Sequence, residues 1–122
     1  MIDQYLWGTC ERISPEAPVQ IVSVDNEDTL LGGAGNVVNN LKALGAKVDV
    51  ISVVGNCIVS DELKVLLGDI EVSTKYLFTE KDRITSKKSR IIAAQQQVVR
   101  YDLESTAAVS YTHLTLPTIC SV

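Results

Sequence analysis

The feature that most constrains this 122-residue chain is a glycine-rich loop, Gly32-Gly33-Ala34-Gly35-Asn36, which lies between a strand pattern and a helix pattern. Before it, residues 19–24 alternate apolar and polar side chains, which predicts a half-buried strand. After it, apolar residues at helical spacing predict a helix over residues 36–44, which Gly45 ends. A dense β-branched run over residues 48–54 is typical of a parallel strand buried on both faces. This order of elements predicts an α/β fold.

The rest of the chain adds a second helix and a hairpin. Residues 60–67 predict a short helix with acidic side chains in its first turn, where the helix dipole favours them. Asp82-Arg83 predicts a turn. Residues 86–92 and 98–102 predict two strands joined by a polar connection, which indicates an antiparallel flap added to the α/β unit.

The glycine loop fits neither of two familiar phosphate-binding motifs. A dinucleotide-binding loop needs glycine where Val38 stands, and a strand that runs directly into its first glycine, whereas Asp28 and Thr29 interrupt the apolar pattern. A Walker-type loop needs Gly-Lys-Ser/Thr at its end, and Asn36-Val37 is different. Two interpretations remain, a polar ligand held by free backbone N–H groups, or tight packing of helix against strand.

Charge and cysteine content exclude several classes of function. The chain has 11 basic and 15 acidic residues, a formal net charge of −4, so nucleic acid and anionic membrane are not expected as partners. It shows no signal-peptide pattern and no apolar run long enough to span a bilayer. The three cysteines, at 10, 57 and 120, indicate neither a disulfide framework nor a zinc site. We therefore expect a cytoplasmic protein.

The composition changes abruptly near Ser105. Every charged side chain lies between Asp3 and Glu104, and residues 105–122 carry none. The stretch 109–122 resembles the translation of a sequencing adapter, although its Thr, Tyr, Leu and Ile content would also suit a β-rich edge segment. We therefore predict one partial domain over residues 1–104 and a non-native tail over 105–122.

Three groups of glycines, taken together, resemble the N-terminal signature of the ribokinase-like (PfkB) carbohydrate kinases: the loop at 32–36, Gly45 and Gly55. Within that family the heptose 7-phosphate kinases are the most similar, on the motifs Trp7-Gly8, 12–19, Arg90-Ile91-Ile92 and 95–102. The resemblance covers residues 1–104. It implies the N-terminal part of a three-layer ribokinase-like fold, with parallel strands and an antiparallel β flap. Two positions depart from the family pattern: Val38, usually small, and Asn56-Cys57, where the family commonly has an Asp and then a Gly.

The resemblance implies a sugar-binding role for four residues. Asp3 matches the carboxylate that accepts hydrogen bonds from sugar hydroxyls, and Gly32 and Gly33 match the pair whose backbone approaches the sugar. Asn36 matches an amide that both donates to and accepts from the sugar. The alternatives are a solvated terminal charge for Asp3 and a helix N-cap for Asn36.

Four cations are candidates for holding a remote phosphate on the substrate, since guanidinium groups grip phosphate bidentately and lysine adds a point charge. These are Arg12, Lys88, Arg90 and Arg100. The alternative is that each is an ordinary solvated surface charge.

The implied activity is transfer of the γ-phosphate of ATP, with Mg²⁺, to the anomeric hydroxyl of heptose 7-phosphate, in the synthesis of ADP-heptose for lipopolysaccharide. In the family the catalytic base is an Asp in a downstream Gly-Ala-Gly-Asp motif, which this sequence lacks. We therefore expect about the first third of a kinase, inactive alone and binding neither nucleotide nor metal. The implied partners are a sugar phosphate and a second copy paired through the flap. The alternatives are another sugar kinase, such as a fructokinase or ribokinase, and a non-catalytic binding or dimerisation module.

Overall fold

The computed structural model of the chain describes residues 1–105, and the predicted tail therefore lies outside the described residues except for Ser105. The described part contains six strands and two helices. In chain order they are β1 (Ile2–Ile13), β2 (Gln20–Leu31), α1 (Ala34–Ala43), β3 (Ser52–Val54), α2 (Ile58–Asp69), β4 (Leu77–Thr79), β5 (Lys87–Ala93) and β6 (Gln96–Leu103).

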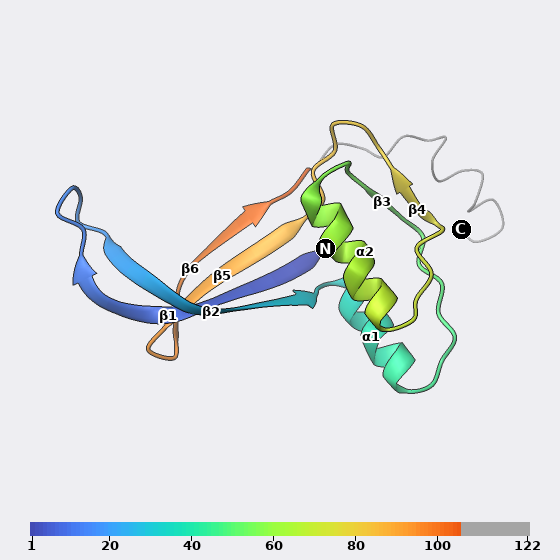
Figure 1. Ribbon diagram of the computed structural model, residues 1–122, viewed down its shortest axis with the longest axis horizontal. Coiled ribbons are helices and arrows are strands. Elements are labelled where there is room, and N and C mark those ends of the chain that lie inside the picture. The colour runs from blue at the N-terminus through green and yellow to red at the C-terminus, as the bar shows by residue number, and fades with distance from the viewer. Residues whose placement is uncertain (106–122) are drawn as a thin grey trace.

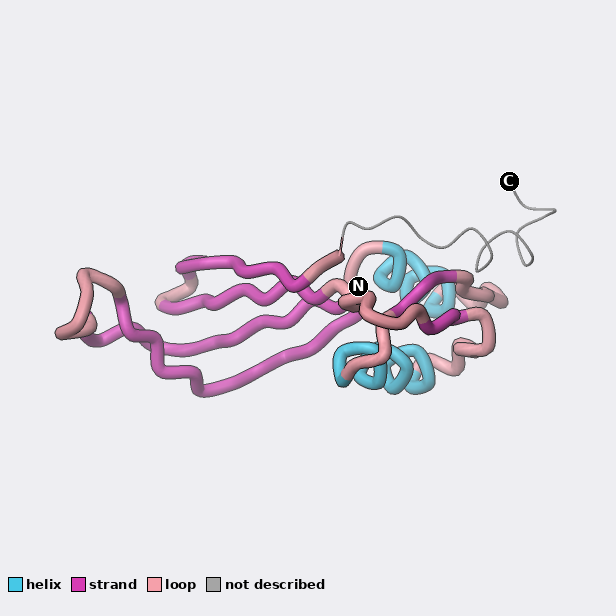
Figure 2. The backbone as a smooth tube through the Cα atoms, turned by 90° about the horizontal axis from the view of Figure 1, so that it is seen from above, coloured by secondary structure: helices cyan, strands magenta, loops and turns pink. Residues whose placement is uncertain are grey.

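Four strands form a long sheet that projects away from the two helices (Figures 1 and 2), in the order β2-β1-β5-β6. The hairpins β1–β2 and β5–β6 are antiparallel, and the parallel pair β1–β5 joins them into one sheet. This sheet is the predicted flap. It is larger than the sequence suggests, because the first hairpin contributes two of its strands.

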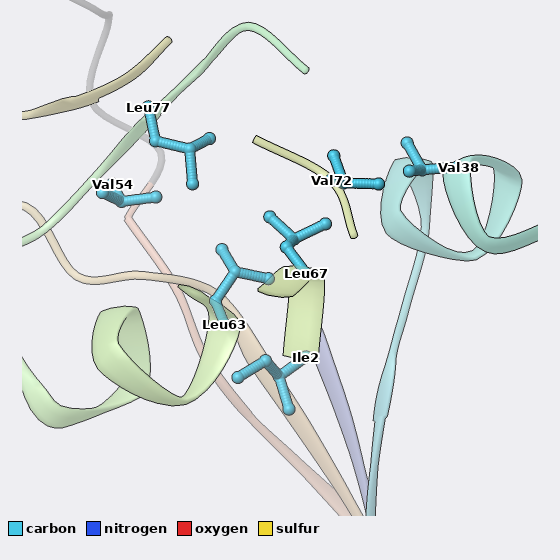
Figure 3. Close-up of a cluster of buried hydrophobic side chains, with 7 residues drawn as sticks. All are labelled: Ile2, Val38, Val54, Leu63, Leu67, Val72 and Leu77. Carbon is cyan, nitrogen blue, oxygen red and sulfur yellow. The ribbon is translucent and has the colours of Figure 1, made fainter. Parts of the chain in front are cut away.

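The strands β3 and β4 form a separate parallel pair that packs with α1 and α2. Their contact is an apolar cluster to which both helices, both strands and the start of β1 contribute (Figure 3). Its buried members are Ile2, Val38, Val54, Leu63, Leu67, Val72 and Leu77. Since Ile2 is fully buried in this cluster, the root of the flap is anchored in the core of the helical part.

Helix α1 lies between two glycines: Gly45 follows its last turn, as the sequence predicts, and Gly33 precedes its first residue, Ala34, two residues before the predicted start. Gly33 is the N-cap, with a φ of 55° that a residue with a Cβ rarely adopts. At the other end the N–H of Gly45 donates to Lys42 and that of Ala46 donates to Leu41, the paired bonds of a Schellman motif. The φ of Gly45 is 85°, which explains why glycine stands there.

Two strands differ from the sequence-based expectation. No strand is predicted over residues 2–13, where β1 lies, because Gln4 occupies an inward position and breaks the apolar alternation. Strand β2 continues through the polar residues Asp28 and Thr29 to Leu31, directly before Gly32. That part of the argument against a dinucleotide-binding loop is therefore wrong. The loop still lacks the third glycine, and it follows an antiparallel strand of the flap.

The buried strand predicted over residues 48–54 is also shorter than expected. Only Ser52–Val54 pair with β4, and Ile51 is 42% exposed. Val48 and Val50 pack against the apolar cluster without joining a ladder. Within residues 1–105 this segment is therefore covered on one side, and the expected burial on both faces is not seen there.

Cys57 is the N-cap of α2 but makes no capping hydrogen bond with its side chain. The hydroxyls of Ser60 and Thr85 lie 2.6 Å apart, and Thr85 accepts a hydrogen bond from the N–H of Gly55 at 2.8 Å. Burial raises the pKa of the Cys57 thiol, but hydrogen bonds with Ser60 and Thr85 outweigh that effect and lower the pKa to about 7. Helix α2 therefore begins without a side-chain cap.

We predict that Cys57→Asp stabilises the protein. A carboxylate at the N-cap accepts a hydrogen bond from the first turn of α2 and faces the positive end of the helix dipole, which together contribute about 1 kcal/mol. The midpoint of thermal unfolding should rise by roughly 4–8 °C. Cys57→Ala removes the thiol without adding a cap and is the matched control. Equal melting temperatures for the Asp and Ala variants would show that the capping account is wrong.

The turn between β5 and β6 offers a second test of backbone conformation. Ala94 and Gln95 form a two-residue loop with φ of 52° and 61°, so both residues adopt the left-handed conformation. Asn-Gly is the preferred pair for such a turn. The double variant Ala94→Asn, Gln95→Gly should raise the free energy of unfolding by about 1 kcal/mol, measured by urea denaturation.

The matched control for the turn is Gln96→Gly, one position further along in β6. Its backbone is extended, so glycine there should lower the free energy of unfolding by roughly 0.5–1 kcal/mol. A loss of stability in the turn variant would mean that the chain does not adopt this turn.

Candidate functional site

The pairing of β1, β5 and β6 places several charged side chains on one face of the flap. Asp3 is the register partner of Lys88, which in turn faces Asp102 on β6. Successive side chains of a strand point to opposite faces, so the next row on the same face lies two residues along. That row consists of Tyr5, Arg90 and Arg100. We call this surface the charged face.

Asp3 lies against the glycine loop. A Cβ placed on Gly32 would come within 2.6 Å of the Asp3 carboxyl group, so only glycine allows the loop to approach so closely. The N–H of Gly32 donates to the carbonyl of Met1 at 3.1 Å, which holds the loop beside the start of β1. The structure therefore brings together two of the predicted sugar-binding residues.

Asp3 also faces Arg90 on the neighbouring strand. Asp3 Oδ1 and Arg90 Nη1 lie 3.4 Å apart, and their side chains are about 20% exposed. Both atoms are buried, and neither has a hydrogen-bond partner among residues 1–105. The two atoms form an ion pair with each other, which offsets part of the cost of burying both charges. Asp3 is therefore more than a solvated terminal charge.

The remaining cations of this face converge on Asp102. Lys88 Nζ lies 2.9 Å from Asp102 Oδ2 and 3.9 Å from Glu104, while Arg100 contacts both Asp102 oxygens at 3.2 Å. The hydrogen bond from Lys88, aided by the charge of Arg100, lowers the pKa of the Asp102 carboxyl group. Acids thus balance the three cations of this face. A bound phosphate would be held by directed N–H donors rather than by a net positive field.

Arg90 and Arg100 are register partners, and like charges directly opposite each other destabilise a sheet. Each is compensated by a different acid, Asp3 for Arg90 and Asp102 for Arg100. An anion placed between the two guanidinium groups would have donors on both sides. Of the predicted phosphate-binding residues, these two and Lys88 therefore lie together.

The other predicted residues are not part of the charged face. Gly33 and Asn36 are exposed at the start of α1, directly after Gly32. Asn36 makes no capping hydrogen bond, because Gly33 is the N-cap, so its alternative role as a cap is not seen. Arg12 is exposed at the opposite end of β1 from Asp3 and does not join the charged face. Its role in phosphate binding stays a prediction.

Sequence reasoning missed Tyr5 and Asp102. Tyr5 lies under the Arg90 guanidinium, whose central carbon is 5.5 Å from the ring centre. The sequence signal for Tyr5 is its position two residues after Asp3. In a strand over residues 2–13 this spacing places both side chains on the same face. Asp102 could have been found by the same spacing from Arg100 in the predicted strand 98–102.

The described residues define what this site can do. Within residues 1–105, no cluster of His, Cys, Asp or Glu side chains is arranged to hold a metal ion. Neither of the two helices there is long and apolar enough to cross a membrane. The charged face offers a carboxylate beside the glycine loop and three cations, which suits recognition of a polyhydroxylated anion.

Proteins with closely similar sequences carry a common name. The chain is 65% identical to the bifunctional protein HldE of Aliarcobacter butzleri over 105 residues, which cover 86% of this chain and 22% of the relative. It is 60% identical to the protein of the same name from Sulfurimonas denitrificans over 110 residues, covering 90% of this chain and 23% of that one. The chain thus spans less than a quarter of the length of these relatives.

Solved structures support the fold. A carbohydrate kinase from Agrobacterium tumefaciens superposes with a TM-score of 0.62 at 23% identity, covering 84% of this chain and 32% of that one. The nucleoside kinase of Methanocaldococcus jannaschii, an archaeal member of the ribokinase family, gives 0.60 at 17% identity, with coverages of 84% and 33%. The ribokinase-like fold is therefore confirmed. The family model for the pfkB family carbohydrate kinases matches residues 2–118, and this chain belongs to that family.

Proposed function

We propose that this chain forms the sugar-recognition part of a kinase that phosphorylates the anomeric hydroxyl of heptose 7-phosphate with ATP, for ADP-heptose synthesis in the cytoplasm. The observation that carries the proposal is the Asp3 carboxylate, which lies against Gly32 and faces Arg90 on a surface with two further cations. High identity to proteins named bifunctional protein HldE supports this choice over a fructokinase or ribokinase.

The proposed binding mode follows from the chemistry of these side chains. Asp3 accepts hydrogen bonds from sugar hydroxyls, and Arg90 holds the Asp3 carboxylate in place through their ion pair. Asn36 adds an amide that both donates and accepts. Lys88, Arg90 and Arg100 hold the phosphate of the substrate, because charge-assisted bonds from guanidinium and ammonium groups are short and strong.

The transfer step needs groups beyond this surface. Phosphoryl transfer requires a base for the attacking hydroxyl and positive charge on the transferring phosphate, which Mg²⁺ supplies together with bound ATP. We propose that the parent kinase provides the base and the nucleotide site outside residues 1–105. The 122-residue chain on its own then binds sugar phosphate without turning over ATP.

A second copy is proposed to pair with the flap at its outer end. Ile13 and Val19, at the tip of the β1–β2 hairpin, are 67% and 56% exposed, and Val24 nearby is 49% exposed. Apolar side chains gathered at one tip are typical of a contact surface. This arrangement supports a homodimer as the partner state.

Ile13→Lys should convert this dimer into a monomer, because it places a charge in an apolar contact. Light scattering coupled to size exclusion measures the mass. Leu44→Lys, a change at an 83% exposed position next to α1, is the control and should leave the dimer intact. A wild-type chain that elutes as a monomer at every concentration would rule out the homodimer.

The kinase proposal is tested in a chimera in which residues 1–104 replace the matching segment of the Aliarcobacter butzleri relative. The chimera should phosphorylate heptose 7-phosphate, with ribose and fructose as poorer substrates, and the isolated chain should not. Asp3→Asn should lower kcat/KM about 10- to 100-fold, since a hydrogen bond to a charged group contributes about 1.5–3 kcal/mol. Gly32→Ala should act in the same direction by displacing the carboxylate.

Asp25→Asn is the matched control for the loss of a carboxylate, because Asp25 is exposed on β2 where the strand pairing is irregular. It should leave kcat/KM within about twofold of the parent value. A preference for ribose or fructose over heptose 7-phosphate would show that the substrate assignment is wrong. An unchanged kcat/KM for Asp3→Asn would show that the assignment of Asp3 to the sugar-binding site is wrong.

A further inference from the structure

The ion pair of Asp3 and Arg90 does not by itself fix the orientation of the two side chains. Asp3 Oδ1 and Arg90 Nη1 lie 3.4 Å apart, but neither atom has a hydrogen-bond partner among residues 1–105. An arginine side chain loses much rotamer entropy when it is ordered, and an ion pair without a directed hydrogen bond does little to select one rotamer. Across the sheet Arg90 also faces Arg100, whose like charge repels it. A further contact is therefore needed to hold Arg90 beside Asp3.

The ring of Tyr5 makes this contact. Tyr5 is the register partner of Arg90, and the central carbon of the guanidinium lies 5.5 Å from the centre of the ring. The negative face of an aromatic ring attracts a cation, and a flat guanidinium group can stack on it. This contact uses the face of the guanidinium, so the N–H donors at its edge stay available to the Asp3 carboxylate and to a phosphate.

The orientation of the Tyr5 ring is itself restrained by its neighbours. The Trp7 ring stacks against it, with centres 6.1 Å apart and planes 21° from parallel. The indole N–H of Trp7 donates to Asp28 Oδ2 at 2.9 Å, and Asp28 is the register partner of Tyr5 on β2. Arg90 on one neighbouring strand and Trp7 on the same strand thus both contact this half-buried ring. The ring is therefore placed to support Arg90 rather than to contact a ligand.

We propose that Tyr5 is a positioning residue of the sugar site, which holds the Arg90 guanidinium beside Asp3 and so fixes the carboxylate against Gly32 before the sugar binds. The inference rests on the proposed function, because it assigns the preorganisation of the same site. Without the ring, Arg90 lies beside Asp3 in only a fraction of the molecules. The substrate binds productively to that fraction alone, which weakens its apparent affinity and leaves the bound complex unchanged.

The first test measures kcat and KM for heptose 7-phosphate in the same chimera at saturating ATP. Tyr5→Leu should raise KM about three- to tenfold, the range expected for the loss of a partly exposed cation–π contact, and leave kcat within about twofold. Tyr5→Phe should restore the wild-type KM, because it keeps the face of the ring and removes only the hydroxyl. Tyr5→Ile, whose β-branched side chain suits a strand, gives the same comparison if Tyr5→Leu lowers the melting temperature.

The second test asks whether Tyr5 acts through Arg90. In the Arg90→Gln background the ring has no guanidinium to hold, so Tyr5→Leu should raise KM by less than about twofold further. Equal effects of Tyr5→Leu with and without Arg90 would mean that Tyr5 contacts the sugar or supports only the fold, and would overturn the inference. A Tyr5→Phe variant that keeps the raised KM would overturn it as well, because the hydroxyl would then be the group that matters.

Tyr101→Leu is the matched control. Tyr101 lies on β6 in the row of Ser89 and Gln4, on the opposite face of the sheet from Tyr5. The change should leave KM within about twofold of its starting value in either background. An unchanged KM for Tyr5→Leu in an active chimera would overturn the inference while the proposed function stands. A wild-type chimera inactive on heptose 7-phosphate would instead remove the proposed function, and this inference with it.

Discussion

The parallel pairing of β1 with β5 is the contact on which the fold and the site both depend. It joins two hairpins distant in sequence into one sheet and aligns Asp3 with Lys88 and Tyr5 with Arg90. A buried hydrogen bond supports this register, since the Ser89 hydroxyl donates to the Gln4 side-chain oxygen at 2.7 Å. A slip by one residue would turn Asp3 and Tyr5 to the other face and leave Gln4 without this partner.

The same strand couples the flap to the helical part of the molecule. Ile2 is buried among Leu63, Leu67 and their neighbours, and Asp3 directly follows it on the opposite face of the sheet. Lys87, at the start of β5, pairs with Glu62 of α2 at 3.3 Å. The site therefore lies at the junction of flap and core, where one end of each strand is anchored. The edge strand β6, every residue of which is exposed, has few contacts to restrain it.

Much of this arrangement could be predicted from local chemistry. Gly33 and Gly45 mark the ends of α1 because their backbone conformations require glycine, and the hairpin of β5 and β6 follows from two β-rich runs with a polar connection. Strand β1 could not be predicted in this way, because its inward row includes Gln4, whose polarity is satisfied by Ser89 and Glu27 from other strands. The short length of β3 could not be predicted either. A β-branched run indicates a strand but does not show how many of its residues pair with a neighbouring strand.

The grouping of the site residues also depends on strand pairing between segments that are distant in sequence. The family resemblance indicates Asp3, Gly32 and Asn36, but nothing local shows that Arg90 lies beside Asp3, since that contact depends on the β1–β5 register. Arg12, in a motif that favours the same function, lies at the far end of β1.

The most direct measurement is a double-mutant cycle of Asp3→Asn and Arg90→Gln, with kcat/KM for heptose 7-phosphate measured in the chimeric kinase. If Arg90 holds the Asp3 carboxylate in position for the sugar, the double variant should lose less than the sum of the single losses, by about 1 kcal/mol or more. Strictly additive losses would mean that Asp3 and Arg90 act independently, which contradicts a sugar site built on the pairing of β1 with β5.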